Sequence, residues 1–336
     1  NANAYVLSTG GAVFKNVQIG GTTIQYVITN SGIFSFGDGS DGTVTISGNT
    51  TLTADKYYDD LTVDAGFTLS PAGYRIFVKG TLTLNGTISR NGATATSATA
   101  VAALAAGYLN GAPITGAGGA TQDNASGLPG GAGVATSNSL GSNSSAGQAG
   151  GDSSTGDRVG GAGGAAGVAT VSNVKLIANW HLAVLLDVAA SGSTVKFDNS
   201  ASAAGGGAGG DAGPLTIPGA GGAGGGGGGI VAIYARVLTI SATGTITANA
   251  GNGADGGTGT ADGGDPAIYS GHGGGGAGGN GGIIVLVYNS LTNSGSITAT
   301  AGTGGLGGGH PGTGAVAKTP ANSGSAGTIY QFQLSL

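Results

Sequence analysis

The stretch Gly219–Tyr234 reads GAGGAGGGGGGIVAIY, and Gly271–Tyr288 reads GHGGGGAGGNGGIIVLVY. Each copy joins a glycine tract to an apolar β-segment, and these segments begin at Ile230 and Ile283, 53 positions apart (283 − 230). A polar β-segment follows each copy. Repetition at a fixed spacing is typical of stacked structural units rather than of a single-site globular enzyme. The repeat therefore predicts that the glycines are structural and that the protein presents a surface.

The composition favours strands over helices. The 336 residues include 77 glycines, about three times the usual share. Charged residues make up 7%, and all 15 acidic residues are Asp. Without Glu or Met, long helices lack several of their best formers, whereas the abundant Thr, Ser, Val, Ile and Asn suit strands and turns.

The glycine tracts have two interpretations. Glycine-rich chain is often a flexible linker, but these tracts contain Ala and lead directly into apolar strands. The alternative is a bundle of polyglycine-II-type helices, which are extended, have about three residues per turn, and pack closely because no Cβ intervenes. The glycines expected to form this scaffold are Gly221, Gly225, Gly228, Gly274, Gly278 and Gly281. On this interpretation, replacing residues 225–228 with Ala unfolds the C-terminal half.

Four regions of the sequence differ in composition and in their pattern of apolar residues. Residues 1–42 read as short β-strands, and residues 43–92 as a regular β-layer or solenoid. Residues 93–159 are a low-complexity segment of Ala, Gly, Ser and Asn, and residues 160–336 form a glycine-rich repeat domain with interleaved strands. We therefore predict an all-β fold with β-solenoid-like or stacked β-layers and a glycine-helix bundle in the C-terminal part.

Recurring β-segments predict which strands are equivalent. LTVDAGFTL begins at Leu61 and LTLNGTIS at Leu82. The triplets Thr87–Ser89, Thr245–Thr247 and Ser296–Thr298 follow the same pattern of a polar, an apolar and a polar residue. We infer that the β-layers continue through the chain while glycine tracts leave and re-enter them. Tyr234 and Tyr288 each end a repeated strand and are expected to be equivalent residues packed at the layer edge.

These segments resemble a known class of proteins. Residues 41–92, from DGTVTISGNTTLT to NGTISRNG, look like the receptor-binding tail proteins of tailed bacteriophages. The GGAGG and GGGG tracts beyond Gly160 are similar to the glycine-rich tail-fibre adhesins of T-even-like phages. That resemblance implies packed polyglycine-II helices and exposed loops that touch a host receptor. It assigns no individual contact residue, because the loops are the variable part.

Several residues are candidates for binding. Tyr is a favoured contact residue at recognition surfaces, and the histidines within glycine tracts are expected at loop tips. The candidates for receptor contact are Tyr108, Asp262, Tyr269, His272 and His310. Asp255, Asp262 and Asp265 cluster in one loop, where turn-capping is the simplest role and a calcium site is the alternative. No other cofactor is expected.

Other function classes receive little support. The ten basic residues are scattered and the net charge is −5, which argues against a nucleic-acid partner. No segment reaches the about 18 apolar residues of a membrane span. Two G-x-G-x-x-G matches, at residues 251–256 and 302–307, lack the following helix that a dinucleotide site needs. We expect no catalytic activity.

The sequence thus favours an extracellular attachment protein on a virion surface that binds a host receptor or glycan. The absence of Cys and Met suits a particle that is never repaired, and an Asn at position 1 suggests processing or truncation upstream. One alternative is an oligomeric structural subunit of a virion or an extracellular filament, associating through the edge segments Tyr5–Ser8 and Thr328–Leu336. Another is a glycan depolymerase on a β-solenoid.

Overall fold

The computed structural model describes most of the chain from residue 36 onward. The described residues are 4–6, 12–14, 17–19, 22–24, 36–104, 107, 109, 111–134, 136–137, 143–154, 158–170, 205, 216–262, 267–309 and 319–334. The regular elements with defined bounds are all strands, so the fold is all-β, as predicted.

Two parallel sheets make up the main β-structure. The six-stranded sheet contains, in spatial order, β17 (Thr328–Gln333), β15 (Ile283–Asn293), β13 (Ile230–Ile240), β9 (Ile76–Leu84), β7 (Lys56–Val63) and β5 (Gly42–Ile46). The five-stranded sheet contains β16 (Ser296–Thr298), β14 (Thr245–Thr247), β10 (Thr87–Ser89), β8 (Thr68–Ser70) and β6 (Thr50–Thr51).

The other described strands form three two-stranded sheets. β1 (Ala4–Val6) pairs antiparallel with β2 (Ala12–Phe14), and β3 (Val17–Ile19) with β4 (Thr22–Ile24). β11 (Thr136–Ser137) pairs in parallel with β12 (Ala169–Thr170).

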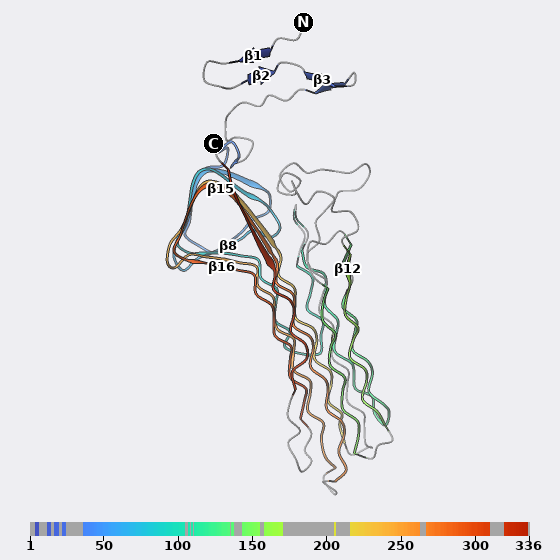
Figure 1. Cartoon of the computed structure of the whole chain (residues 1–336). Coiled ribbons are helices and arrows are strands. Elements are labelled where there is room, and N and C mark those ends of the chain that lie inside the picture. Colours follow the sequence, from blue (N-terminus) through green and yellow to red (C-terminus); the bar gives the residue numbers. More distant parts are fainter. Residues whose placement is uncertain are drawn as a thin grey trace.

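The chain alternates between the two large sheets. Each of the first five strands of the six-stranded sheet, in chain order, is followed by one strand of the five-stranded sheet. We call each such pair a layer, so β5 and β6 form the first layer and β15 and β16 the fifth. Figure 1 shows these layers stacked on one another, with long extended segments leading away from them.

Strands far apart in the sequence pair across the six-stranded sheet. Residues 90–229 separate β10 from β13, yet β13 pairs in parallel with β9. Residues 248–282 and 299–327 intervene in the same way before β15 and β17. The prediction that the β-layers continue while glycine tracts leave and re-enter them is confirmed.

The register agrees with most of the predicted equivalences. Ile230 lies opposite Ile283, Leu61 opposite Leu82, and Ile88 opposite Ile246. The equivalence of Tyr234 and Tyr288 is wrong.

Tyr234 lies opposite Val287, and Tyr288 opposite Ala235. The two tyrosines therefore differ by one position in register, and successive residues of a strand point to opposite faces. Accordingly, Tyr234 belongs to the cluster outside the six-stranded sheet, whereas Tyr288 packs against the core between the sheets. The strand sequences contain this difference, because Tyr234 stands four positions after Ile230 and Tyr288 five positions after Ile283.

The main core lies between the two sheets. Alternate residues of the long strands, such as Leu61, Leu82 and Leu238, meet the central residues of the short strands, such as Ile88 and Ile246. All five side chains are buried. Burying apolar surface in this way is the main favourable term in folding, and the polar–apolar–polar triplets supply one inward side chain per layer.

The outer face of the six-stranded sheet carries a second apolar cluster. Tyr57, Phe77 and Tyr234 stack across β7, β9 and β13 with ring centroids 4.8 and 4.9 Å apart. Phe36 and Leu109 pack against the same cluster and are fully buried. Because both faces of the sheet are covered there, β13 and β15 begin with continuous apolar runs, from Ile230 and from Ile283.

Backbone hydrogen bonds that recur at every third residue hold the glycine tracts side by side. The amides of the 219–229 tract that donate to the 271–282 tract, at 2.9–3.0 Å, belong to Gly219, Gly222, Gly225 and Gly228. Intervening residues bond elsewhere, since the Gly226 amide donates to Ala93 and the Gly224 amide to Gly116. The backbone therefore turns toward a different neighbour at each residue and returns after three.

The 271–282 tract has the same pattern. Its donors to the 248–257 segment are Gly273, Gly276, Gly279 and Gly282. Gly278 and Gly281 donate instead to Asn322 and Ser325 in the next segment. Buried backbone amides and carbonyls need hydrogen-bond partners, and here the partners lie in neighbouring segments.

Close backbone approach explains why these positions are glycine. A Cβ atom at Gly225, Gly228, Gly274, Gly278 or Gly281 would overlap with a carbonyl oxygen of the adjacent segment, far inside 3.0 Å. Gly221 is buried and donates its amide to Gly119. Alanine occurs where more room exists: Ala223 and Ala254 meet Ala95 and Val101 in a small apolar cluster.

Arg90 joins the sheets to the tracts. It directly follows β10, is buried, and its Nη1 donates to the Ile230 carbonyl at 3.3 Å. The Gly229 amide donates to the Arg90 carbonyl at 2.8 Å, and the Arg90 side chain lies where a Cβ of Gly229 would be. Burial lowers the pKa of Arg90 to about 10.

The close approach can be tested at two adjacent glycines. In Gly228→Ala, the new Cβ would overlap with the Ala248 carbonyl and lie 2.6 Å from the Gly282 nitrogen. In Gly227→Ala, its nearest atoms are the Ala112 Cβ at 3.2 Å and the Asn280 oxygen at 3.5 Å. We expect Gly228→Ala to lower the free energy of unfolding by about 1–3 kcal/mol or more, and Gly227→Ala by less than about 1 kcal/mol.

Thermal unfolding followed by circular dichroism measures both variants. Equal unfolding temperatures for the two would contradict the close packing of this tract.

Candidate functional site

Three of the predicted contact residues lie together at the ends of the tracts farthest from the sheets. The Asp262 amide donates to the Ile268 carbonyl at 2.8 Å, and Ala261 forms an antiparallel bridge with Tyr269. The Tyr269 amide donates to Ser154 Oγ at 2.8 Å. The next segment is tied to the same region, because the His272 carbonyl accepts the Gly151 amide at 2.8 Å.

Neighbouring segments reach the same end. The Ile217 amide donates to Thr260 Oγ1 at 2.6 Å, and the Gly127 amide donates to the Val159 carbonyl at 3.0 Å. The 158–168 segment is joined in turn to residues 150–151 by the bond from the Gly150 amide to the Gly161 carbonyl. We call this end the distal surface, which comprises the described residues 121–128, 151–154, 158–159, 216–217, 260–262 and 267–272.

The distal surface exposes three aliphatic side chains that the sequence analysis missed. Ile217, Val159 and Leu128 are 66%, 57% and 38% exposed. A signal for two of them was present, because Leu128 and Ile217 both stand directly before Pro-Gly within otherwise small-residue sequence. Large apolar residues are expected to be buried in a monomer, so a group of exposed ones marks an interaction surface.

The remaining predicted contact residues, Tyr108 and His310, lie outside the described residues, as does Asp265. The neighbours of Tyr108 are near the sheets, because the Leu109 amide donates to the Gly73 carbonyl at 2.7 Å. The distal surface therefore includes neither of the residues adjacent to Tyr108.

Asp255 belongs to a ladder of side chains that cap backbone amides. Asn249, Asn252 and Asp255 stand at every third residue, and their Oδ1 atoms accept the amides of Thr300, Thr303 and Leu306 at 2.8–3.0 Å. Asn91 Oδ1 and Thr94 Oγ1 accept the amides of Asn249 and Asn252 in the same manner. Each side chain thus replaces a backbone acceptor at the exposed side of the tracts.

This ladder gives Asp255 a structural role that does not need an ion. Within the described part of the chain, no three His, Cys, Asp or Glu side chains are grouped to hold a metal. Asp255 Oδ1 already accepts a backbone amide, while Asp262 stands seven positions further on, within the hairpin of the distal surface. The calcium site stays a prediction.

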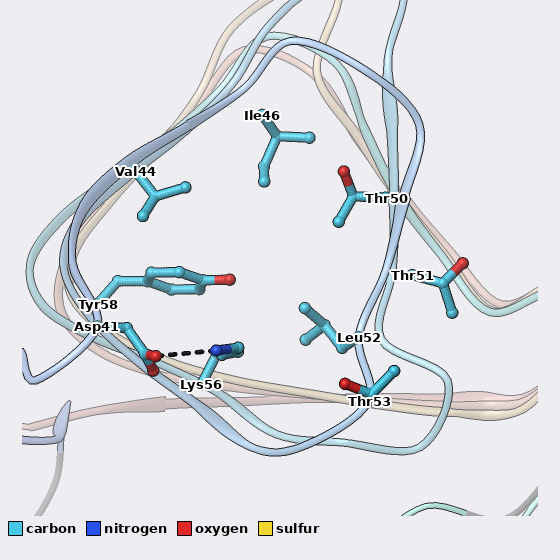
Figure 2. A pocket seen from close by; sticks show the side chains of 9 residues that line it. All are labelled: Asp41, Val44, Ile46, Thr50, Thr51, Leu52, Thr53, Lys56 and Tyr58. Carbon is cyan, nitrogen blue, oxygen red and sulfur yellow. Dashed lines mark hydrogen bonds and ion pairs between the residues drawn. The ribbon is translucent and has the colours of Figure 1, made fainter.

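A second feature lies in the first layer. A pocket of about 270 Å³ opens there; we call it the first-layer pocket, and its lining consists of Asp41, Val44, Ile46, Thr50, Thr51, Leu52, Thr53, Lys56 and Tyr58. Figure 2 shows Ile46 and Leu52 turned into the pocket and the Tyr58 hydroxyl aimed at its middle. No motif in the sequence indicates this pocket, because it forms where the core between the sheets ends.

Charges at the pocket are paired. Lys56 Nζ lies 2.9 Å from Asp41 Oδ1, and the Asp41 Oδ2 atom accepts the Tyr57 amide at 2.6 Å. Burial pushes the pKa of Asp41 up, but the bonds from Lys56 and Tyr57 outweigh it and leave the pKa below its usual value. Burial raises the pKa of Tyr58 to about 12, so its hydroxyl is neutral at physiological pH.

Comparisons with known proteins assign no function to either site. No protein-family model, curated protein or solved structure matches the chain. Among the described residues, no helix is long and apolar enough to cross a membrane.

The capping role of Asp255 predicts a specific pattern of stability. Asp255→Ala removes the acceptor for the Leu306 amide and is expected to cost about 1 kcal/mol, whereas Asp255→Asn keeps an oxygen acceptor and costs less. Chemical denaturation of the two variants and the parent, with and without added calcium, measures the difference. A calcium-dependent gain in the parent that Asp255→Asn abolishes would instead assign the carboxylate to an ion site.

Proposed function

We propose that this chain is an attachment protein on the surface of a tailed-bacteriophage virion and that its distal surface contacts a receptor on the host cell. One observation carries the proposal: tracts paired by hydrogen bonds lead from the sheets to loops that expose Ile217, Val159 and Leu128 beside Tyr269. The resemblance of the glycine tracts and of residues 41–92 to phage tail proteins supports the same assignment.

We further propose that the layers form a β-solenoid and that the tracts are polyglycine-II helices. Parallel strands stacked in sequence order support the first assignment. The second is supported by hydrogen bonds that return to the same neighbour after three residues, which matches a helix of three residues per turn. In this arrangement the solenoid anchors the tracts, and the tracts hold the distal loops away from it.

Such a scaffold suits attachment without catalysis. Loops held by close-packed tracts lose little conformational freedom when they bind, which lowers the entropic cost of association. The exposed aliphatic side chains and Tyr269 provide the apolar contacts typical of the centre of an interface. On this proposal the protein is extracellular and part of a larger virion assembly.

An alternative is a structural subunit that assembles through sheet edges. Among the described strands, β17 lies at one edge of the six-stranded sheet and pairs with β15. Edge strands of this kind can pair with another chain. The other predicted edge segment differs, because its Tyr5 and Val6 lie in β1 and pair with β2.

Electron microscopy separates the two proposals. An antibody fragment raised against this chain is applied to the native source, and its position on the particle is recorded. Label at a tail tip or fibre end is expected for an attachment protein. Label distributed along a capsid, a tail tube or a filament would overturn the attachment proposal and favour the structural subunit.

The distal surface can also be tested by substitution. Ile217→Asp places a charge at the most exposed aliphatic side chain of this surface, and we expect it to reduce binding of the purified protein to host cells at least tenfold. Ile114→Asp is the matched control, because Ile114 is also exposed, at 49%, but belongs to the 111–119 segment near the sheets. Equal binding by the two variants in a cell-adsorption assay would exclude the distal surface as the contact.

A further inference from the structure

The first-layer pocket is faced by the hydroxyl of a side chain that is otherwise buried. Tyr58 is only 3% exposed, and its hydroxyl points into the pocket (Figure 2). Within the described part of the chain, no residue forms a hydrogen bond with this hydroxyl. A hydroxyl that faces a pocket without a protein partner can both donate a hydrogen bond to a bound molecule and accept one from it.

The charge of the pocket indicates a neutral ligand. Its two charged side chains, Asp41 and Lys56, neutralise each other at 2.9 Å. A charged ligand would have to break this pair or be buried without a counter-charge, and both cost free energy. The remaining polar groups are hydroxyls, which both donate and accept hydrogen bonds.

The shape and lining indicate a molecule with an apolar face and a polar rim. Val44, Ile46 and Leu52 supply aliphatic surface, while Tyr58 and Thr50 supply hydroxyls on the inner side (Figure 2). The volume of about 270 Å³ is just under the range of roughly 300–1,000 Å³ typical of drug-sized ligands. One ring of a sugar has the matching character, because its C–H groups form an apolar face and its hydroxyls form the rim.

The opposite end of the stack, at β17, carries polar side chains. There, Gln331 accepts a hydrogen bond from the Tyr288 hydroxyl at 3.4 Å, and Gln333 Nε2 donates to the Asn289 carbonyl at 3.1 Å. Polar side chains thus complete their hydrogen bonds within the chain at β17. The first layer differs in presenting an open, aliphatic-lined pocket.

We propose that the first-layer pocket binds one neutral sugar residue, with the Tyr58 hydroxyl hydrogen-bonded to a sugar hydroxyl. This site is separate from the distal surface, since the tracts leave the sheets only after β10. Sugar binding here does not rest on the proposed attachment function.

The experiment uses the full chain and five neutral probes: the methyl glycosides of glucose, galactose, mannose, N-acetylglucosamine and N-acetylgalactosamine. Saturation-transfer NMR and titration measure binding of each. We expect at least one probe to bind the parent protein and Tyr58→Phe to weaken that binding about tenfold, because this variant removes only the hydroxyl. Tyr57→Phe is the control, since Tyr57 is adjacent but stacks on Phe77 outside the sheet.

Two further variants separate this site from others. Ile46→Trp, which fills the pocket, is expected to abolish sugar binding, and its thermal unfolding shows whether the fold is intact. Ile217→Asp is expected to bind the sugar as the parent does, even where it fails to bind cells. The proposal is overturned if none of the five probes binds the parent, or if folded Tyr58→Phe binds as tightly as Tyr57→Phe.

Discussion

Everything beyond the sheets depends on how closely two polypeptide backbones can approach when no Cβ stands between them. In the tracts, carbonyl oxygens occupy the space that a side chain would fill at Gly225, Gly228 and Gly278. That proximity allows amides to reach acceptors in three neighbouring segments. The tracts are therefore ordered by backbone hydrogen bonds, with a small apolar contribution where Ala223 and Ala254 meet.

The layers and the glycine tracts pack their backbones in different ways. In the layers, side chains fill a core and the backbone pairs sideways within flat sheets. In the tracts, backbone packs directly against backbone, and polar side chains such as Asn252 on the exposed side cap amides. Arg90 links the layers to the tracts. It is buried, directly follows β10, and donates a hydrogen bond to the carbonyl of Ile230, the first residue of β13.

Much of the architecture could be read from the sequence because repetition reports register directly. The spacing of Ile230 and Ile283 and the polar–apolar–polar triplets placed the right strands side by side. The equivalence of Tyr234 and Tyr288 failed because it rests on residue type, whereas the two tyrosines stand four and five positions after the paired Ile230 and Ile283. The significance of Ile217 and Tyr58 comes only from the structure: Ile217 is an aliphatic residue left exposed, and Tyr58 is a buried residue whose hydroxyl faces a pocket at the end of a core.

The three-residue bonding pattern also restricts how the tracts can change in length. Inserting one or two residues would rotate every following amide away from its acceptor, whereas three residues restore each donor to the same neighbour. An outgoing segment and its returning partner must change together, because the strand that follows has a fixed place in the sheet. The distance between the layers and the distal loops can therefore change only in steps of three residues.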